Sequence, residues 1–263
     1  MIVNVNNFFL YFILPAVTII SLITNRYYYK KKDTHKTQFN IPVDLFFGNF
    51  VASLITIGLM LGIYSYILNM SLLAGLQWEI ATIYTMVFLA LVLGLGAGAH
   101  IVAVHVERVL PKTDRSEELQ KILHFYHWPF GHRLTYIPIF LIVHILILLD
   151  LFKGSIVSLH VFQLMMLTLF AVISGIMAWI IFVMTHATRI MLYTLGVMVG
   201  SIFIMLNAET ITLAQHEVAY FFTTVYIVAF VLLVIYRYSH HISESLHTFI
   251  HSKFDDGDKV RDE

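Results

Sequence analysis

The sequence predicts an all-α polytopic membrane protein, a bundle of seven transmembrane helices with the N-terminus outside and the C-terminus in the cytoplasm. Its composition, its long apolar stretches and the distribution of its basic residues lead to this prediction. Hydrophobic residues make up 59% of the 263 residues and charged residues only 12%, and the mean hydropathy is +0.82. A soluble domain carries about 25% charged residues. Most of the surface is therefore expected to face lipid.

The second observation is a series of apolar stretches long enough to cross a bilayer, which takes about 20 residues in a helix. Seven stretches qualify, near residues 8–24, 43–68, 79–104, 134–152, 157–185, 187–207 and 215–237. We expect the first to be an uncleaved span and not a signal peptide, because its positive charge follows the apolar run instead of preceding it. We expect one transmembrane domain over residues 1–251, ending in a juxtamembrane cytoplasmic helix, and a disordered charged tail over 252–263.

The third observation is the distribution of the 16 lysines and arginines. With the N-terminus outside, all of them except Lys153 lie on the cytoplasmic side, as the preference of basic residues for cytoplasmic loops requires. The predicted location is the cell (inner or plasma) membrane, with the lipid bilayer as the main partner.

Composition also excludes several kinds of chemistry. The chain has no cysteine, so thiolate metal ligands and cysteine nucleophiles are ruled out. Its formal net charge of +0 argues against nucleic-acid binding, which needs a basic patch. A retinal Schiff base needs a buried lysine, and every lysine falls in a predicted loop or tail. Any metal must therefore be held by histidine and carboxylate.

Histidines gather at the cytoplasmic ends of the predicted helices, and the stretch "HFYHWPFGHR" (124–133) is the densest group. We predict a divalent metal site, zinc or iron, because imidazole with carboxylate is a favoured ligand set for both. The expected ligands are His100, His127 and His132, with His105 and His124 as substitutes. An interfacial loop with incidental imidazoles is an equal alternative.

The expected carboxylate partner and catalytic group is Asp44, at the start of the second span. His100 and His105 are five residues apart and point about 140° apart on a helix, whereas His100 and Glu107 share a face. We expect residues 117–126 to form a helix along the membrane surface, which Pro129 and Gly131 then break.

The glycines of the third span provide a possible contact surface. Gly94 and Gly98 form a small-xxx-small pattern, which lets a neighbouring helix approach closely. The neighbour is either another helix of this chain or a partner, which includes a second copy of the same protein.

These features favour a membrane metalloprotein, an enzyme that acts on a lipidic or apolar substrate at the cytoplasmic boundary. One alternative is a b-type haem subunit for electron transfer, with His144 or His100 paired with His186 as axial ligands. Another is a non-catalytic transport or partner protein.

Overall fold

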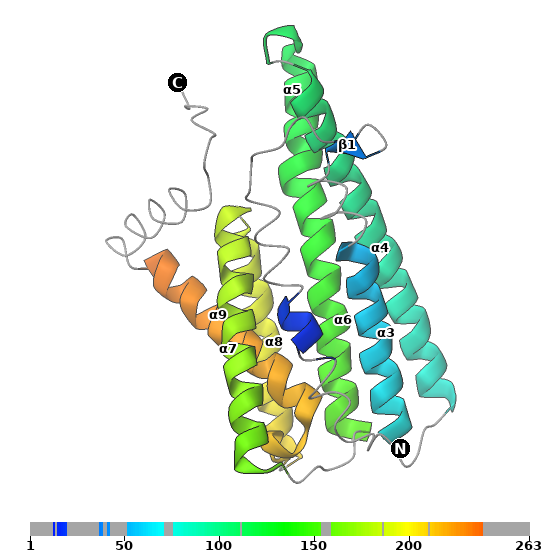
Figure 1. The fold of residues 1–263 in the computed structure, drawn as a ribbon, viewed down its shortest axis with the longest axis vertical. Helices are drawn as coiled ribbons and strands as arrows, with labels where there is room; N and C mark the ends of the chain where they lie inside the picture. The colour runs from blue at the N-terminus through cyan, green and yellow to red at the C-terminus, as the bar shows by residue number, and fades with distance from the viewer. Residues whose placement is uncertain are drawn as a thin grey trace.

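The computed structural model describes residues 13, 15–19, 37–38, 41–42, 52–70, 76–110, 112–153, 159–185, 187–209 and 211–238. These residues form a bundle of long helices (Figure 1). The long helices are α3 (Ala52–Met70), α4 (Leu76–Val109), α6 (His132–Lys153), α7 (Val161–Met184), α8 (Thr188–Ala208) and α9 (Glu217–Tyr238). The short elements are the antiparallel strands β1 (Thr37–Gln38) and β2 (Ile41–Pro42), the 3-10 turns η4 (Lys112–Asp114) and η6 (Leu213–Gln215), the helix α5 (Glu117–Phe125) and the π-helical turn η5 (Tyr126–Gly131).

Five helical segments of the described residues are long and apolar enough to cross a membrane. They run over Ile80–Glu107, Glu117–Phe152, Val161–Met184, Thr188–Ala208 and Glu217–Tyr238. Each overlaps one of the last five predicted spans, although the segment over the span predicted at 134–152 already begins at Glu117. The second predicted span corresponds to α3, whose apolar part, Leu54–Ile67, is shorter. Most of the first predicted span, the juxtamembrane helix and the tail lie outside the described residues. The total of seven spans therefore stays a prediction.

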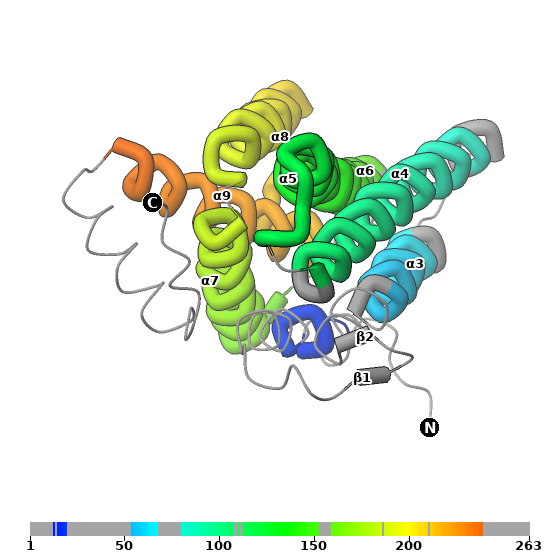
Figure 2. Tube along the Cα trace, turned by 90° about the horizontal axis from the view of Figure 1, so that it is seen from above, coloured from blue at the N-terminus to red at the C-terminus, as the bar shows by residue number. Residues whose placement is uncertain are grey.

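Packing divides the described helices into two groups that meet at α6. On one side, α9 packs against α6, α7 and α8, and on the other side α3 and α4 pack against α6. The view from above shows this division, with α7, α8 and α9 on one side of α6 and α3 and α4 on the other (Figure 2). Large apolar side chains such as Leu146, Phe182, Phe221 and Tyr226 fill the core between them.

The outward faces of the bundle are also apolar. Tyr84, Leu91 and Leu95 of α4, and Val197 and Ile204 of α8, are all exposed. Monomeric soluble proteins rarely expose contiguous apolar surface of this kind. The surface therefore agrees with the composition and fits an apolar environment around the helices.

The contact between α4 and α6 depends on Gly96. A Cβ atom at this position would lie 2.5 Å from the backbone carbon of Leu134 and 2.6 Å from its Cβ, so only glycine allows this crossing. At Gly94 and Gly98 an added Cβ would meet no described atom within 4 Å. The Gly94/Gly98 face is thus not the surface on which a described helix of this chain packs, because α6 lies on the opposite side of α4. Contact of that face with a partner protein stays a prediction.

Polar residues hold the start of α9 against α3 and α6. The Asp150 carboxylate accepts a hydrogen bond from the Ala219 backbone N–H (2.8 Å), one of the unpaired donors of the first helical turn. The His216 imidazole contacts the Asp150 backbone oxygen (2.8 Å), and the Tyr66 hydroxyl donates to the Glu217 carboxylate (3.3 Å). Asp150, His216 and Glu217 are all buried. These contacts connect α3, α6 and α9.

Candidate metal centre

Three histidines from two separate parts of the chain converge at one end of the bundle. His100 lies on α4, His127 lies in η5, and His132 begins α6. One ring nitrogen from each lies within 4.8 Å of the other two. The ring centroids are 4.9 Å apart for His100 and His127, 4.5 Å for His100 and His132, and 5.5 Å for His127 and His132. The three side chains lie close enough together to hold a metal ion.

The π-helical turn η5 explains how His127 and His132 come to the same side. Residues five apart point about 140° apart on an α-helix, at about 100° per residue. A π-helix instead bonds residue i to residue i+5, and such turns occur frequently at functional sites. The wider turn therefore aligns two histidines that regular α-helical geometry would separate.

Pro129 and Gly131 do not break the helix, so the prediction that the helix ends there is wrong. The segment Glu117–Phe152 is helical throughout, and α5 continues the axis of α6 instead of forming a separate surface helix (Figure 1). Proline disrupts an α-helix because it has no N–H and its ring clashes with the carbonyl four residues earlier. Here Pro129 lies inside the π turn, where the hydrogen-bond pattern is already changed.

Gly131 brings α4 against the π turn. A Cβ atom at Gly131 would lie 2.6 Å from the Tyr126 backbone oxygen and 2.9 Å from the His100 Cβ. The backbone that carries His127 and His132 therefore lies against the backbone of His100 at Gly131, where only glycine fits.

A carboxylate supports the cluster from outside. Glu107 Oε2 lies 2.7 Å from His127 Nδ1, which leaves the Nε2 of His127 as its metal-binding atom. Metal-ligating histidines almost always use their second nitrogen in this way, which fixes the tautomer and the orientation of the ring. The Arg115 guanidinium donates to the backbone oxygens of Glu107 and Leu110, and so fastens the end of α4 that carries Glu107.

Aromatic rings line the outer sides of two of the histidines. Trp128 stacks on His127 with centroids 4.8 Å apart, and Tyr136 stacks on His132 at 5.6 Å with an interplanar angle of 4°. An interfacial aromatic belt explains the presence of Trp128 and Tyr136 in the sequence. In the structure they also limit the orientations available to the imidazoles.

The other predicted site residues do not join this group. His105 and His124 were expected as substitute ligands, but neither belongs to the described cluster; His124 is exposed and lines a cavity next to the cluster. Asp44, the predicted carboxylate, lies outside the described residues. Glu107 was not assigned this role from the sequence, although its helical spacing from His100 was a usable signal.

The structure gives the haem alternative no support among the described residues. His144 Nε2 lies 3.2 Å from Ser201 Oγ and joins α6 to α8. The ring of His100 has two other imidazole rings with centroids within 5 Å of its own. His186, the proposed second axial ligand, lies outside the described residues.

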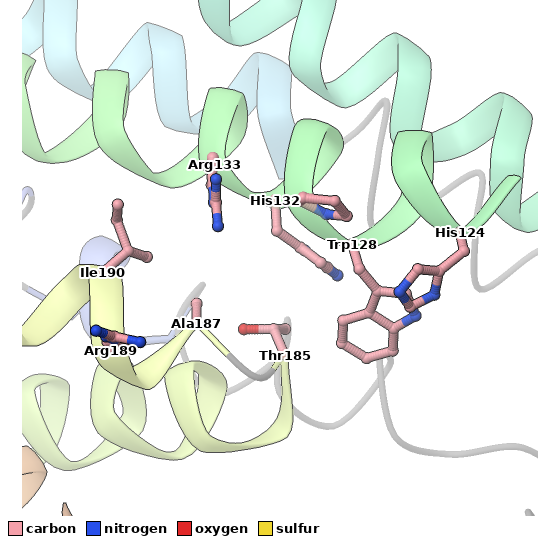
Figure 3. Close-up of a pocket in the computed structure, with 9 residues that line it drawn as sticks. His124, Trp128, His132, Arg133, Thr185, Ala187, Arg189 and Ile190 are labelled. Atoms are coloured by element: carbon pink, nitrogen blue, oxygen red, sulfur yellow. The ribbon is translucent and has the colours of Figure 1, made fainter. Parts of the chain in front are cut away.

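A cavity of about 440 Å³ adjoins the cluster at His132. It lies between the segment formed by η5 and α6 and the turn that joins α7 to α8 (Figure 3). Its described lining comprises His124, Trp128, Pro129, His132, Arg133, Thr185, Ala187, Arg189 and Ile190. A ligand in this cavity would lie directly beside one of the three histidines.

No protein-family model, no curated protein and no solved structure matches this chain.

Replacing Glu107 with glutamine tests its support of His127. We expect a 10- to 100-fold loss of zinc affinity, the usual effect of removing such a partner, because the neutral amide cannot increase the basicity of the imidazole as the carboxylate does. Competition with a chromophoric chelator on the purified protein measures the affinity. Glu118→Gln is the matched control, since Glu118 is exposed and lies on α5, outside the cluster. Equal affinities in both variants would contradict the role of Glu107.

Proposed function

We propose that this protein is an integral membrane zinc enzyme that holds its metal with His100, His127 and His132 and acts on a lipidic substrate. The observation that carries the proposal is the convergence of three imidazoles within 4.8 Å at the end of apolar helices, with a carboxylate on the far nitrogen of one of them. Histidines that only happened to lie at the membrane interface would not be expected to converge, or to have a carboxylate as a hydrogen-bond partner.

The donor set favours zinc over iron. Three imidazole nitrogens with an open fourth position are one of the ligand sets of catalytic zinc, whereas non-haem iron oxygenases use two histidines and one carboxylate. The Glu107 carboxylate is not in the group of converging ligands, and it contacts His127 Nδ1. With zinc–nitrogen bonds near 2.0 Å, ligand nitrogens lie about 3.3 Å apart in a tetrahedral site, so we expect metal binding to draw the three rings inward.

Each part of the site has a separate task in this proposal. Zinc held by three histidines supplies a nucleophile at neutral pH, because it lowers the pKa of a bound water to about 7. Glu107 orients His127, while the stacked rings of Trp128 and Tyr136 limit the movement of their imidazole neighbours. The adjoining cavity gives a substrate access to the side of His132. Hydrolysis of a lipid ester or amide is the reaction class that these parts support best.

The proposal also includes a topology. We infer seven spans with the N-terminus outside, because the loops and the tail that are then cytoplasmic carry all the lysines and arginines except Lys153. The histidine cluster then lies at the cytoplasmic boundary, within reach of lipid headgroups. Five described helices long and apolar enough to cross a membrane support this arrangement, and the cell membrane is the proposed location.

Elemental analysis and a visible spectrum of the detergent-purified protein test the proposal. We expect a colourless protein with stoichiometric zinc, which a chelator removes and added zinc restores. Activity on lipid esters and amides should follow the zinc content through this cycle. A Soret band would overturn the proposal in favour of haem, and a well-folded protein that neither contains nor takes up zinc would overturn it altogether.

A further inference from the structure

We infer that the cavity beside His132 binds the phosphate group of an amphiphile, held between Arg133 and Arg189. This inference names the substrate class for the proposed zinc site and rests on that proposal only for its catalytic meaning, since binding in the cavity does not itself need zinc.

The first support is the placement of the two arginines. Arg133 follows His132 on α6, and Arg189 is the second residue of α8. They come from opposite walls, Arg133 from α6 and Arg189 from the start of α8 (Figure 3). The gap between two elements far apart in the sequence is therefore lined by an arginine from each, and both arginines are exposed.

The second support is the charge of the walls. The two arginines are the only residues with a permanent charge in the described lining, and the described lining contains no acidic residue. Neither guanidinium forms an ion pair with a described carboxylate. The cavity thus presents two positive charges whose natural counterpart is an anionic ligand.

The geometry of the ligand follows from this arrangement. A guanidinium binds two oxygens at once through its planar fork of donors, and matches both carboxylate and phosphate. A carboxylate directs its two oxygens to one side, whereas the oxygens of a phosphate point in tetrahedral directions. Two guanidiniums on opposite walls are therefore better satisfied by phosphate.

The remaining walls indicate that the phosphate belongs to an amphiphile. Trp128, Pro129, Ala187 and Ile190 give the cavity an apolar side, and its volume of about 440 Å³ falls in the usual range for small-molecule sites. Inorganic phosphate would fill only the polar part. A lipid with a phosphate headgroup places its apolar chains towards the helices and its headgroup between the arginines, next to His132.

Binding to detergent-purified protein tests the inference, with native mass spectrometry as the readout. The probes are a short-chain phosphatidic acid, and separately inorganic phosphate. We expect saturable binding of phosphatidic acid, and roughly tenfold weaker binding in each of Arg133→Gln and Arg189→Gln, as the loss of one charge-assisted contact implies. Arg237→Gln is the matched control, since Arg237 is an exposed arginine at the end of α9 and outside the cavity lining.

The outcomes separate this inference from the proposed function. Equal phosphatidic acid binding in all three variants would overturn the inference, because it would reflect general attraction of lipid headgroups to basic residues. If inorganic phosphate bound as tightly as phosphatidic acid, with the same dependence on the arginines, the ligand would be a soluble phosphate compound. The assignment of an amphiphile would then be overturned. We expect unchanged zinc content in every arginine variant. A wild-type protein that binds phosphatidic acid with this dependence on the arginines, but neither contains nor takes up zinc, would overturn the zinc enzyme and leave the cavity assignment standing.

Discussion

Replacing His100, His127 or His132 with alanine, one at a time, is expected to abolish stoichiometric zinc binding. Loss of a carboxylate that merely supports a ligand costs 10- to 100-fold in metal affinity, so loss of a ligand should cost at least about 100-fold. A site left with two imidazoles would not retain zinc through gel filtration. Elemental analysis after that step measures the effect, and the thermal unfolding temperature shows whether each variant still folds.

The chain provides its own controls for this experiment. His105→Ala and His124→Ala remove imidazoles from the same end of the molecule but outside the cluster, so both should retain wild-type zinc. Retention of zinc by all three cluster variants would exclude the site. So would an equal loss of zinc in His124→Ala, since the metal would then be bound by surface histidines in general.

The helices could be predicted from the sequence because hydropathy and length follow directly from the physics of the bilayer. The predicted span near 79–104 corresponds to Ile80–Glu107, and the one near 157–185 to Val161–Met184. Which side of a helix meets which neighbour is a different problem. Gly94 and Gly98 have the spacing of a packing motif, yet Gly96 makes the close contact with α6, and only the position of α6 determines that.

In the candidate site, too, residue types could be predicted from the sequence, whereas the contacts between them could not. Residue chemistry placed His100, His127 and His132 among the candidates, since they are imidazoles near one predicted boundary, but it placed His105 and His124 there as well. The way in which they meet was not predictable, because Pro129 and Gly131 are typical of a helix break, whereas the helix continues through a π turn. A π turn has no reliable sequence signature.

The carboxylate illustrates a missed signal. Asp44 lies at the start of a predicted span. An acidic residue is unfavourable there without a partner, and this favours Asp44 as the partner of the histidines. Glu107 lies two helical turns after His100 on the same face, and this spacing alone indicates a carboxylate near the cluster. The helical spacing does not indicate that Glu107 contacts His127. His127 comes from a later segment of the chain, and it meets Glu107 only once that segment packs against α4.

Gly131→Ala is expected to reduce zinc affinity without removing any ligand. The added Cβ would lie 2.6 Å from the Tyr126 backbone oxygen, 2.9 Å from the His100 Cβ and 3.1 Å from its Cα. The Tyr126 oxygen belongs to the π turn itself and the His100 atoms belong to α4, so relief requires the π turn to distort and α4 to move away from it. Overpacking of this kind costs about 1–3 kcal/mol. The movement would take His100 away from His127 and His132, and we expect at least a tenfold loss of zinc affinity.

Gly98→Ala makes the same chemical change where there is space for it, because no described atom lies within 4 Å of the added Cβ. Alanine also favours the helix over glycine by about 1 kcal/mol, so this control should be as stable as the wild type or more stable, with unchanged zinc affinity. Wild-type zinc affinity in Gly131→Ala would mean that the three histidines do not depend on the contact of α4 with the π turn. Loss of zinc in a Gly131→Ala protein that still unfolds cooperatively would show that the backbone contact, as well as the imidazoles themselves, makes the site.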